Sequence, residues 1–322
     1  METGKIKSKD LKMGLANQVV FANTLEELAE TNKDILVVTS DSRGSGKLVP
    51  FGQKYPDQIV EVGIAEQNLV GVAAGLASAG KKPFAVSPAC FITARSLEQI
   101  KNDVAYSDNP AVMVGISAGV SYGALGTTHH SLHDFAVLRA INNISIIAPA
   151  DNYETEQAVR YAADSNKPVY IRLGKKPMPS LKEDDLNFEF GKGRKITEGK
   201  DLVFIASGET VYPAWLAAKE LEDRHGIKAT VVSMHTIKPL DTDLLDSLAE
   251  YGAPIITVEE HMVNGGLGEA CASHLMQKGH RNAFVMVGIP DEYTVTGSQV
   301  EIFNYYGISK EGLYSLGKEM LL

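Results

Sequence analysis

A single ionisable side chain stands in the short segment VGIAEQN, residues 62–68, and it is the carboxylate of Glu66. Apolar residues precede this glutamate, and the Gly/Ala-rich segment after it, residues 69–79, predicts a helix that begins close to it. A carboxylate at such a junction is expected to lose most of its hydration, and it can then hold or share a proton near neutral pH. The alternative is an ordinary first-turn glutamate, which the helix dipole alone would favour.

A group of histidines lies in a glycine-rich loop that we predict over residues 117–134. His129, His130 and His133 carry imidazoles that can exchange protons near pH 7. Asp134 is the one acidic side chain beside them and no cysteine completes a tetrahedral set, so the spacing does not predict a zinc site. Histidines in a polar loop are ordinarily surface residues, but a long loop within a compact sheet is more often functional.

The elements that must position these residues alternate between strands and helices. Before residue 175 we predict strands at 34–39, 59–62, 82–86, 111–116, 145–148 and 168–173, and helices at 15–29, 69–79, 94–105 and 152–163. After residue 200 we predict strands at 202–206, 228–232, 254–258 and 283–287, and helices at 210–224, 242–251, 266–278 and 300–322. This alternation predicts the α/β class, with two doubly wound, mostly parallel sheets.

A change of composition separates the two halves. Prolines, an acidic run at residues 183–185 and basic residues after it predict an interdomain connector, partly strand, at residues 176–200. The domains are therefore expected at residues 1–175 and 201–322. The second half offers one polar cluster with glycines, EEH at 259–261 followed by GGLG at 265–268, which we interpret as a turn and a helix start. We expect no gathering of titratable groups there as tight as in the first half.

Composition excludes several classes of function. A formal net charge of -9 provides no basic patch for nucleic acid, although a small phosphorylated substrate needs only one or two local cations. No segment approaches the roughly 20 apolar residues of a membrane span, and the lysine-rich N-terminus has no apolar signal core. Cys90 and Cys271 lie far apart in apolar surroundings, which predicts buried thiols and a cytoplasmic protein. The dinucleotide-binding motif G-x-G-x-x-G and the P-loop motif G-x-x-x-x-G-K-[ST] are absent from the sequence.

Four motifs in the first half, taken in order, resemble those of transketolases. They are GIAEQN at 63–68, FITAR at 91–95 with EQI at 98–100, GTTHH at 126–130 and APAD at 148–151. The second half resembles the transketolase C-terminal domain, including the EEH and GGLG segments. The resemblance covers nearly the whole chain and is greatest to the separately encoded C-terminal half of two-subunit transketolases. It implies a pyrimidine-binding domain followed by a C-terminal domain, and a transferase that moves a two-carbon ketol unit from a ketose to an aldose.

The resemblance also implies thiamine diphosphate as cofactor and assigns roles to particular residues. Glu66 matches the glutamate that hydrogen-bonds a pyrimidine ring nitrogen and drives the tautomer that activates the thiazolium ring. Phe91 matches an aromatic residue that stacks on the pyrimidine, and Ile64 and Arg95 fall in the same cofactor pocket. His129 matches the histidine that faces the substrate and assists proton transfer on the donor ketose.

Departures from the family pattern concern the substrate. Ser45 and Arg172 match residues that contact a substrate phosphate in transketolases, and a single arginine can bind such an anion with two hydrogen bonds. Leu125, however, stands where transketolases commonly carry an aspartate that contacts a donor hydroxyl. Met13 and Ser117 stand where an arginine and a histidine usually contact phosphate. The resemblance therefore leaves the donor open between a phosphorylated and an otherwise modified ketose.

The family's diphosphate- and metal-binding segment, Gly-Asp-Gly followed by a distant Asn, is absent from this sequence. The resemblance then implies a separate N-terminal subunit that carries this segment and most of the Mg²⁺ ligands, with no metal ligand in this chain. The expected assembly is an A2B2 heterotetramer with cofactors at subunit interfaces. Two alternatives stay open. One is a β-subunit of another thiamine-dependent enzyme, such as a 2-oxo-acid dehydrogenase or a deoxyxylulose-phosphate-synthase-like protein, and the other is a non-catalytic subunit with a decayed site.

Overall fold

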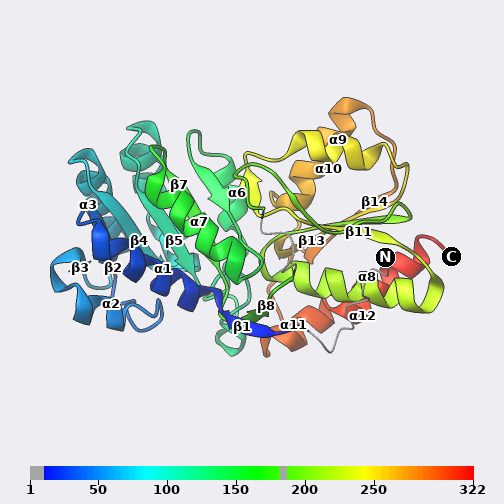
Figure 1. Cartoon of the computed structure of the whole chain (residues 1–322), viewed down its shortest axis with the longest axis horizontal. Coiled ribbons are helices and arrows are strands. Elements are labelled where there is room, and N and C mark those ends of the chain that lie inside the picture. The colour runs from blue at the N-terminus through cyan, green and yellow to red at the C-terminus, as the bar shows by residue number, and fades with distance from the viewer. Residues whose placement is uncertain (1–10, 182–186) are drawn as a thin grey trace.

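The computed structural model describes residues 11–181 and 187–322, which form two α/β domains side by side (Figure 1). The first ten residues, which include most of the lysine-rich N-terminus, and the acidic run of the predicted connector lie outside the described residues. Within the described part of the chain, none of the helices has the combination of length and apolar character that crossing a bilayer would require.

The first domain is built on a seven-stranded sheet that is parallel apart from one edge strand. In spatial order it contains β3 (Ile59–Glu61), β2 (Ile35–Thr39), β4 (Lys82–Pro88), β5 (Val112–Ile116), β7 (Val169–Leu173), β6 (Ser145–Ile147) and β12 (Thr236–Lys238). The central strands β5 and β7 are buried along their whole length, as expected for parallel strands covered by helices on both faces, and β5 is entirely apolar. The predicted parallel α/β sheet is confirmed.

Helices cover both faces of this sheet. One face carries α1 (Asn17–Thr31), α2 (Val49–Lys54) and α7 (Asn152–Asp164), and the other carries α3 (Glu66–Ser78), α4 (Ala89–Arg95), α5 (Leu97–Gln99), the π-helix η2 (Ile100–Tyr106) and α6 (Asp134–Arg139). The apolar core on the α3 side continues without interruption into the second domain. The two domains therefore share one hydrophobic core.

The second domain is built on a five-stranded sheet with a single antiparallel edge strand. In spatial order it contains β14 (Phe284–Ile289), β13 (Ile255–Met262), β10 (Leu202–Ala206), β11 (Ala229–Ser233) and β9 (Arg194–Thr197). Helices α9 (Thr242–Ala249) and α10 (Leu267–Lys278) lie above this sheet in Figure 1, with α8 (Val211–His225) and α12 (Lys310–Glu319) below it. Helix α11 (Gln299–Tyr305) precedes α12.

Several predicted elements differ from the observed ones. The helix predicted at 94–105 begins earlier, at Ala89 directly after Pro88, and it is interrupted at Ser96. The helix predicted at 300–322 is two helices, because Gly307 has a φ of +72° that a continuing helix cannot adopt. Helix α6 was not predicted, since its six residues are too few for a clear periodic pattern.

Pairing between distant segments was also not foreseen. Strand β1 (Met13–Ala16) pairs with β8 (Pro177–Pro179) in a separate two-stranded sheet, so the start of the first domain contacts the start of the predicted connector. The end of that connector supplies β9 to the second sheet. Strand β12 belongs to the second half of the chain by sequence, but it pairs with β6 of the first sheet. The connector is partly strand, as predicted.

Candidate active site

Glu66 is the first residue of α3, and only 3% of its surface is exposed. Its carboxylate oxygen Oε2 accepts a hydrogen bond of 2.8 Å from Nη1 of Arg95, whose side chain is 53% exposed. The helix N-terminus and this guanidinium are the two positive features that accompany the buried carboxylate. The predicted burial of Glu66 at the start of a helix is confirmed.

The loop in front of Glu66 is shaped by a second glutamate, Glu61, at the end of β3. Oε1 of Glu61 accepts hydrogen bonds from the backbone N–H groups of Asp41 and Gly63, at 2.7 and 3.0 Å, and Oε2 accepts one from the Thr39 hydroxyl at 2.8 Å. Burial raises the pKa of Glu61, but these three donors outweigh it and the net shift is downward. A charged Glu61 therefore fixes Gly63, whose φ is +72°, and so sets the direction from which the chain enters α3.

A series of side-chain contacts links Glu66 to the histidine loop through Arg95 and Phe91. The Arg95 guanidinium lies 4.9 Å from the ring centroid of Phe91, and the Phe91 ring meets the imidazole of His129 edge to face at 5.4 Å. His129 in turn contacts the ring of Tyr122 at 5.6 Å. The structure therefore brings together four of the predicted site residues, Glu66, Arg95, Phe91 and His129, although they come from three separate segments of the chain.

A cavity of about 790 Å³ opens beside these residues, between α4, the histidine loop and the second domain. Phe91 and Arg95 line one wall, and His133 lines it together with His130. Residues 291–294, which follow β14, form the wall contributed by the second domain. His129 lies at the margin of this cavity through its contact with Phe91, and Ile64 is 73% exposed on the outer surface in front of α3.

The histidine loop, residues 117–134, is fastened to the second domain through His130. The Nδ1 atom of His130 lies 2.7 Å from the Thr294 hydroxyl, and Nε2 lies 2.9 Å from the carbonyl oxygen of Gly123. The same Thr294 hydroxyl contacts the Thr127 hydroxyl at 3.1 Å. Burial lowers the pKa of His130, so this imidazole holds the loop as a neutral group. The adjacent imidazole of His129 is half-buried and contacts the Thr128 hydroxyl and the two aromatic rings.

A buried carboxylate of the second domain fastens the other end of the same loop. Oε1 of Glu260 accepts hydrogen bonds from the backbone N–H of Val120 at 2.9 Å and from Nε2 of Gln299 at 2.7 Å. The same Nε2 donates to Oε2 of Glu209 at 2.8 Å. Burial, and then the charge of Glu209, raise the pKa of Glu260 to about 8, while Arg172 opposes the shift.

These groups correct the expectation that the second half gathers no tight titratable cluster. Glu209, Glu259, Glu260 and His261 are all buried where the domains meet. Glu259 caps α10, since its two oxygens accept hydrogen bonds from the N–H groups of Leu267 and Gly268 at 2.7 and 2.9 Å. The predicted turn and helix start at the glycines are confirmed, because Gly265 has a φ of +78° and Gly266 precedes the first residue of α10. Sequence periodicity gave no sign of the cluster, because three of its members lie within the buried strand β13 and Glu209 joins them from a distant 3-10 helix.

Glu260 predicts a loss of stability in mildly alkaline solution. Its folded-state pKa lies above the ordinary carboxyl value, so the folded protein binds more protons than the unfolded chain, and the free energy of unfolding falls as pH rises towards 8. Burial lowers the pKa of His235 and His261 to about 4, but histidines are neutral in both states above pH 7 and do not contribute there.

Glu260→Gln is therefore expected to flatten the pH dependence between pH 7 and 8.5 by up to about 1.4 kcal/mol per pH unit. Urea unfolding at the two pH values measures this slope. Glu250→Gln, the same change at an exposed glutamate of the second domain, should leave the slope as in the parent chain. An unchanged slope in Glu260→Gln would show that this carboxyl is already ionised at pH 7.

Arg172 is not among the residues that line the cavity, and its Nε and Nη2 atoms already have hydrogen-bond partners. It is 6% exposed, and its Nε donates to Oδ2 of Asp134 at 2.8 Å. Its Nη2 donates to the carbonyl oxygens of Ser131 and Glu260 at 3.2 and 2.7 Å. In this conformation the buried Arg172 joins the two domains beneath the histidine loop, and its role in binding a substrate phosphate stays a prediction.

Ser45, the other residue predicted to contact phosphate, lies in a region that also holds a cation, Lys175. Burial raises the pKa of Tyr122, and the hydroxyl groups of Ser117 and Ser45, which lie beside the phenol, lower it in part. The ammonium group of Lys175 lies 4.6 Å from the Tyr122 ring centroid. Ser45 is exposed in the loop after β2, and Lys175 is exposed after β7. The sequence analysis identified neither Tyr122 nor Lys175, although Tyr122 lies within the predicted loop 117–134 and Lys175 closely follows β7.

The three departures from the transketolase pattern occupy different environments. Leu125 is 55% exposed in a short 3-10 helix of the histidine loop, and Met13 is exposed on β1. Ser117 is buried directly after β5 with a φ of +54°. Cys90 and Cys271 are both free and buried, as predicted. Among residues 11–181 and 187–322 there is no group of three or more His, Cys, Asp or Glu side chains arranged to hold a metal ion.

Two family models match the chain, one in each half. The model described as "Transketolase, pyrimidine binding domain" matches residues 14–180, and the one described as "Transketolase, C-terminal domain" matches residues 191–313. Together the two matches cover most of the sequence, and both the cavity and the buried cluster lie inside them.

Individual proteins agree with these models. The chain is 47% identical over 302 residues to a protein of Phocaeicola vulgatus that is named as a subunit of apulose-4-phosphate transketolase, with 94% of this chain and 96% of the relative covered. It is 34% identical over 310 residues to a 1-deoxy-D-xylulose-5-phosphate synthase of Halothermothrix orenii, but this match covers 95% of the chain and only 48% of that enzyme. Among solved structures it resembles a split gene transketolase described as an inactive beta4 tetramer, with a TM-score of 0.84, 35% identity, and 96% and 98% of the two chains covered.

Proposed function

The chain belongs to the transketolase family as a C-terminal-type subunit, and from that premise we propose that it acts with a separate N-terminal subunit in thiamine-diphosphate-dependent ketol transfer. The observation that carries the proposal is the burial of Glu66 at the start of α3, paired with Arg95 and joined through Phe91 to His129. This arrangement places a desolvated carboxylate, an aromatic face and an imidazole within one series of contacts.

The residues present fit the pyrimidine end of thiamine diphosphate. When bound, this cofactor supplies a carbanion that attacks the ketose carbonyl and carries the two-carbon unit. Glu66 would hold the pyrimidine through a hydrogen bond and retain a proton at its carboxylate, since burial removes the water that would otherwise compete. Phe91 would pack against the ring, and Arg95 would keep the carboxylate oriented from its exposed side. His129, half-buried beside Phe91, would give or take the proton of a donor hydroxyl.

The partner subunit is proposed on two grounds. A relative of nearly the same length is named as one subunit of a transketolase, and the similar split gene transketolase is described as inactive in its beta4 form. This chain also lacks the Gly-Asp-Gly segment of the family, so the diphosphate and Mg²⁺ would be held mainly by the partner. We propose an A2B2 heterotetramer in which the exposed Ile64 and Arg95 face the partner across the cofactor.

A phosphorylated ketose is the proposed donor, with apulose 4-phosphate as the first candidate from the name of the relative. Lys175 and Ser45 flank Tyr122, whose ring contacts His129, so they offer a cation and a hydroxyl near that histidine. Lysine is a common phosphate ligand as a mobile point charge. In this proposal Lys175 supplies the charge that Met13 and Ser117 do not, and it leaves Arg172 in its buried role.

Lys175→Gln is therefore expected to raise the KM for a phosphorylated donor about 10-fold, because the substitution removes one charge-assisted contact. The kcat at saturation and the KM for a non-phosphorylated ketose should change less than about two-fold, since neither depends on the phosphate. Steady-state assays of the reconstituted enzyme with both donors measure the difference. Lys47→Gln, at an exposed lysine of the loop that contains Ser45, is the matched control. Equal losses with both donors would remove Lys175 from phosphate binding.

The function itself is tested by reconstitution. The chain is mixed with its N-terminal partner, Mg²⁺ and thiamine diphosphate, and product formation is followed with apulose 4-phosphate or a pentulose phosphate as donor and an aldose phosphate as acceptor. Ketol transfer that requires both chains and the cofactor supports the proposal. Consumption of pyruvate in place of a ketose would favour the synthase or dehydrogenase alternative, and an unaltered cofactor affinity on adding this chain would favour a non-catalytic subunit.

A further inference from the structure

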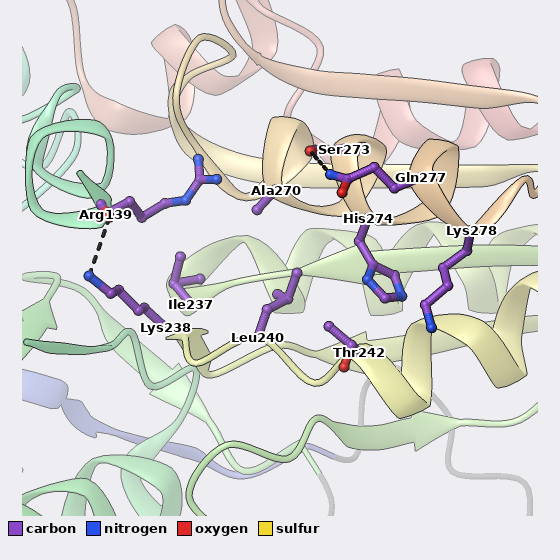
Figure 2. A pocket seen from close by; sticks show the side chains of 10 residues that line it. All are labelled: Arg139, Ile237, Lys238, Leu240, Thr242, Ala270, Ser273, His274, Gln277 and Lys278. Atoms are coloured by element: carbon purple, nitrogen blue, oxygen red, sulfur yellow. Dashed lines mark hydrogen bonds between the residues drawn. The ribbon is translucent and has the colours of Figure 1, made fainter. Parts of the chain in front are cut away.

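A second cavity, of about 560 Å³, lies between the domains and apart from the cavity beside Phe91 (Figure 2). It is bounded by the end of α6 and by β12 on one side, and by helix α10 on the other. Four of the side chains that line it can carry positive charge, and none of the described residues that line it is an aspartate or glutamate. Such a concentration of cations is unusual on a chain whose net charge is -9.

Arg139 and Lys238 form one end of this cavity, and neutral carbonyl groups hold both in place. The Nη1 atom of Arg139 donates to the carbonyl oxygens of Gly265 and Gly266, the latter at 2.7 Å. The Nζ atom of Lys238 donates to the carbonyl oxygen of Arg139 at 3.3 Å and to that of Ile141, so it caps the end of α6 (Figure 2). These contacts fix the positions of the two cations without neutralising them.

The charge at this end is not balanced by an ion pair. Within residues 11–181 and 187–322, no carboxylate oxygen lies within 4.0 Å of a nitrogen of Arg139 or Lys238. The charge of Arg139 acts to lower the pKa of the more distant Glu259. Burial outweighs this effect and raises that pKa to about 7, so Glu259 carries less negative charge than an ordinary carboxylate. Burial, together with Arg139, lowers the pKa of Lys238. Two cations held together with partial burial favour the arrival of an anion.

The other end of the cavity is polar and more exposed. His274 and Lys278 extend from α10 towards it, and both share the carboxylate of Asp246, at 2.7 and 3.9 Å (Figure 2). Between the two ends lie Ser273 and Gln277, which are hydrogen-bonded to each other at 3.0 Å. Hydroxyl and amide groups at this position suit the polyol part of a small ligand, next to a strongly cationic end.

We propose that this cavity binds a small phosphate-bearing anion, with the phosphate against Arg139 and Lys238 and the rest of the molecule along α10. Arg and Lys together are suited to phosphate, the first through its planar donors and the second as a point charge. The site is distinct from the proposed active site and does not depend on it. It is joined to that site by α6, which starts at Asp134, the last residue of the histidine loop, and ends at Arg139.

Binding is tested on the full chain with inorganic phosphate as the probe, against chloride at matched ionic strength. Saturating phosphate is expected to raise the Tm by about 2–4 °C. Lys238→Gln, which keeps an N–H donor for the carbonyls of α6 but loses the charge, and Lys278→Gln should each weaken the apparent Kd, the first about 10-fold. A second arm with fructose 1,6-bisphosphate identifies the source: tighter binding assigns a phosphorylated metabolite, and equal binding assigns free phosphate.

One control separates this cavity from a general effect of surface charge. Lys318→Gln removes the same charge from an exposed position on α12 and should leave the phosphate shift unchanged. The proposal is overturned if phosphate and chloride give the same Tm, or if Lys238→Gln responds to phosphate as the parent chain does. Circular dichroism of each variant shows whether it is folded.

Discussion

An enzyme reconstituted with a Glu66→Gln chain is expected to lose about 10²–10⁴-fold in kcat, while the chain itself folds normally. Glutamine has nearly the same shape and fills the same space at the start of α3. Its neutral amide, however, cannot accept and hold a proton as the carboxylate of Glu66 does. The Arg95 side chain that donates a hydrogen bond to Glu66 is 53% exposed. Weakening this ion pair should therefore lower the free energy of unfolding only slightly, by on the order of 1 kcal/mol or less. Activity and stability should therefore separate clearly.

The measurement is kcat with the partner, Mg²⁺ and saturating cofactor, together with the Tm of the variant chain. Glu98→Gln makes the same chemical change at an exposed glutamate of α5 and should alter neither quantity by more than a small factor. Full activity in Glu66→Gln would remove this carboxylate from the mechanism. A large fall in Tm would instead identify Glu66 as a structural residue.

Gly119→Ala is expected to destabilise the chain by roughly 3 kcal/mol and to loosen the histidine loop. Gly119 has a φ of +61°, and a Cβ atom there would lie 2.2 Å from Cδ of Glu260, the residue that fastens the loop through Val120. Its carbonyl oxygen also accepts a hydrogen bond from the N–H of Ser131, at 2.8 Å, across the loop. The reconstituted enzyme should lose activity together with stability, because His129 lies on the same loop.

Two further variants separate the causes of this destabilisation. Gly80→Ala, at a φ of +80° with no atom within 4 Å of the added Cβ, isolates the cost of the backbone conformation, which should be about 1 kcal/mol. Gly119→Ala combined with Glu260→Ala should be less destabilised than the sum of the two single changes, because the contact is relieved. Urea unfolding gives the free energies. Additive values would show that Glu260 and Gly119 do not interact.

Residues that could be placed from sequence are those whose environment is local. Glu66 stands at a junction between an apolar segment and a helix, and both the helix and the burial follow from its immediate neighbours. The parallel sheets followed from the alternation of apolar strands and amphipathic helices. The motifs in the first half then predicted that Glu66, Phe91 and His129 would lie together, and their contacts confirm this.

Residues that could not be placed depend on contacts across the domain boundary. The neighbouring His129 and His130 are indistinguishable by pattern, yet one is half-buried among aromatic rings and the other is a neutral, buried partner of Thr294. Arg172 matches a family position, but it is buried, with its guanidinium between Asp134 and the carbonyl oxygen of Glu260 in the second domain. No local signal in the sequence reports such distant partners.

Strand β12 has a consequence for how this polypeptide is made. Strand β6 of the first sheet ends at Ile147, but the strand that covers its outer edge, β12, is Thr236–Lys238 and is synthesised much later. Until β12 has left the ribosome, the N–H and C=O groups along the outer edge of β6 have no strand partner. An open edge of this kind is a template for pairing with other chains. The two halves are therefore not successive, independent folding units, because the first stays vulnerable to misassembly until much of the second has emerged.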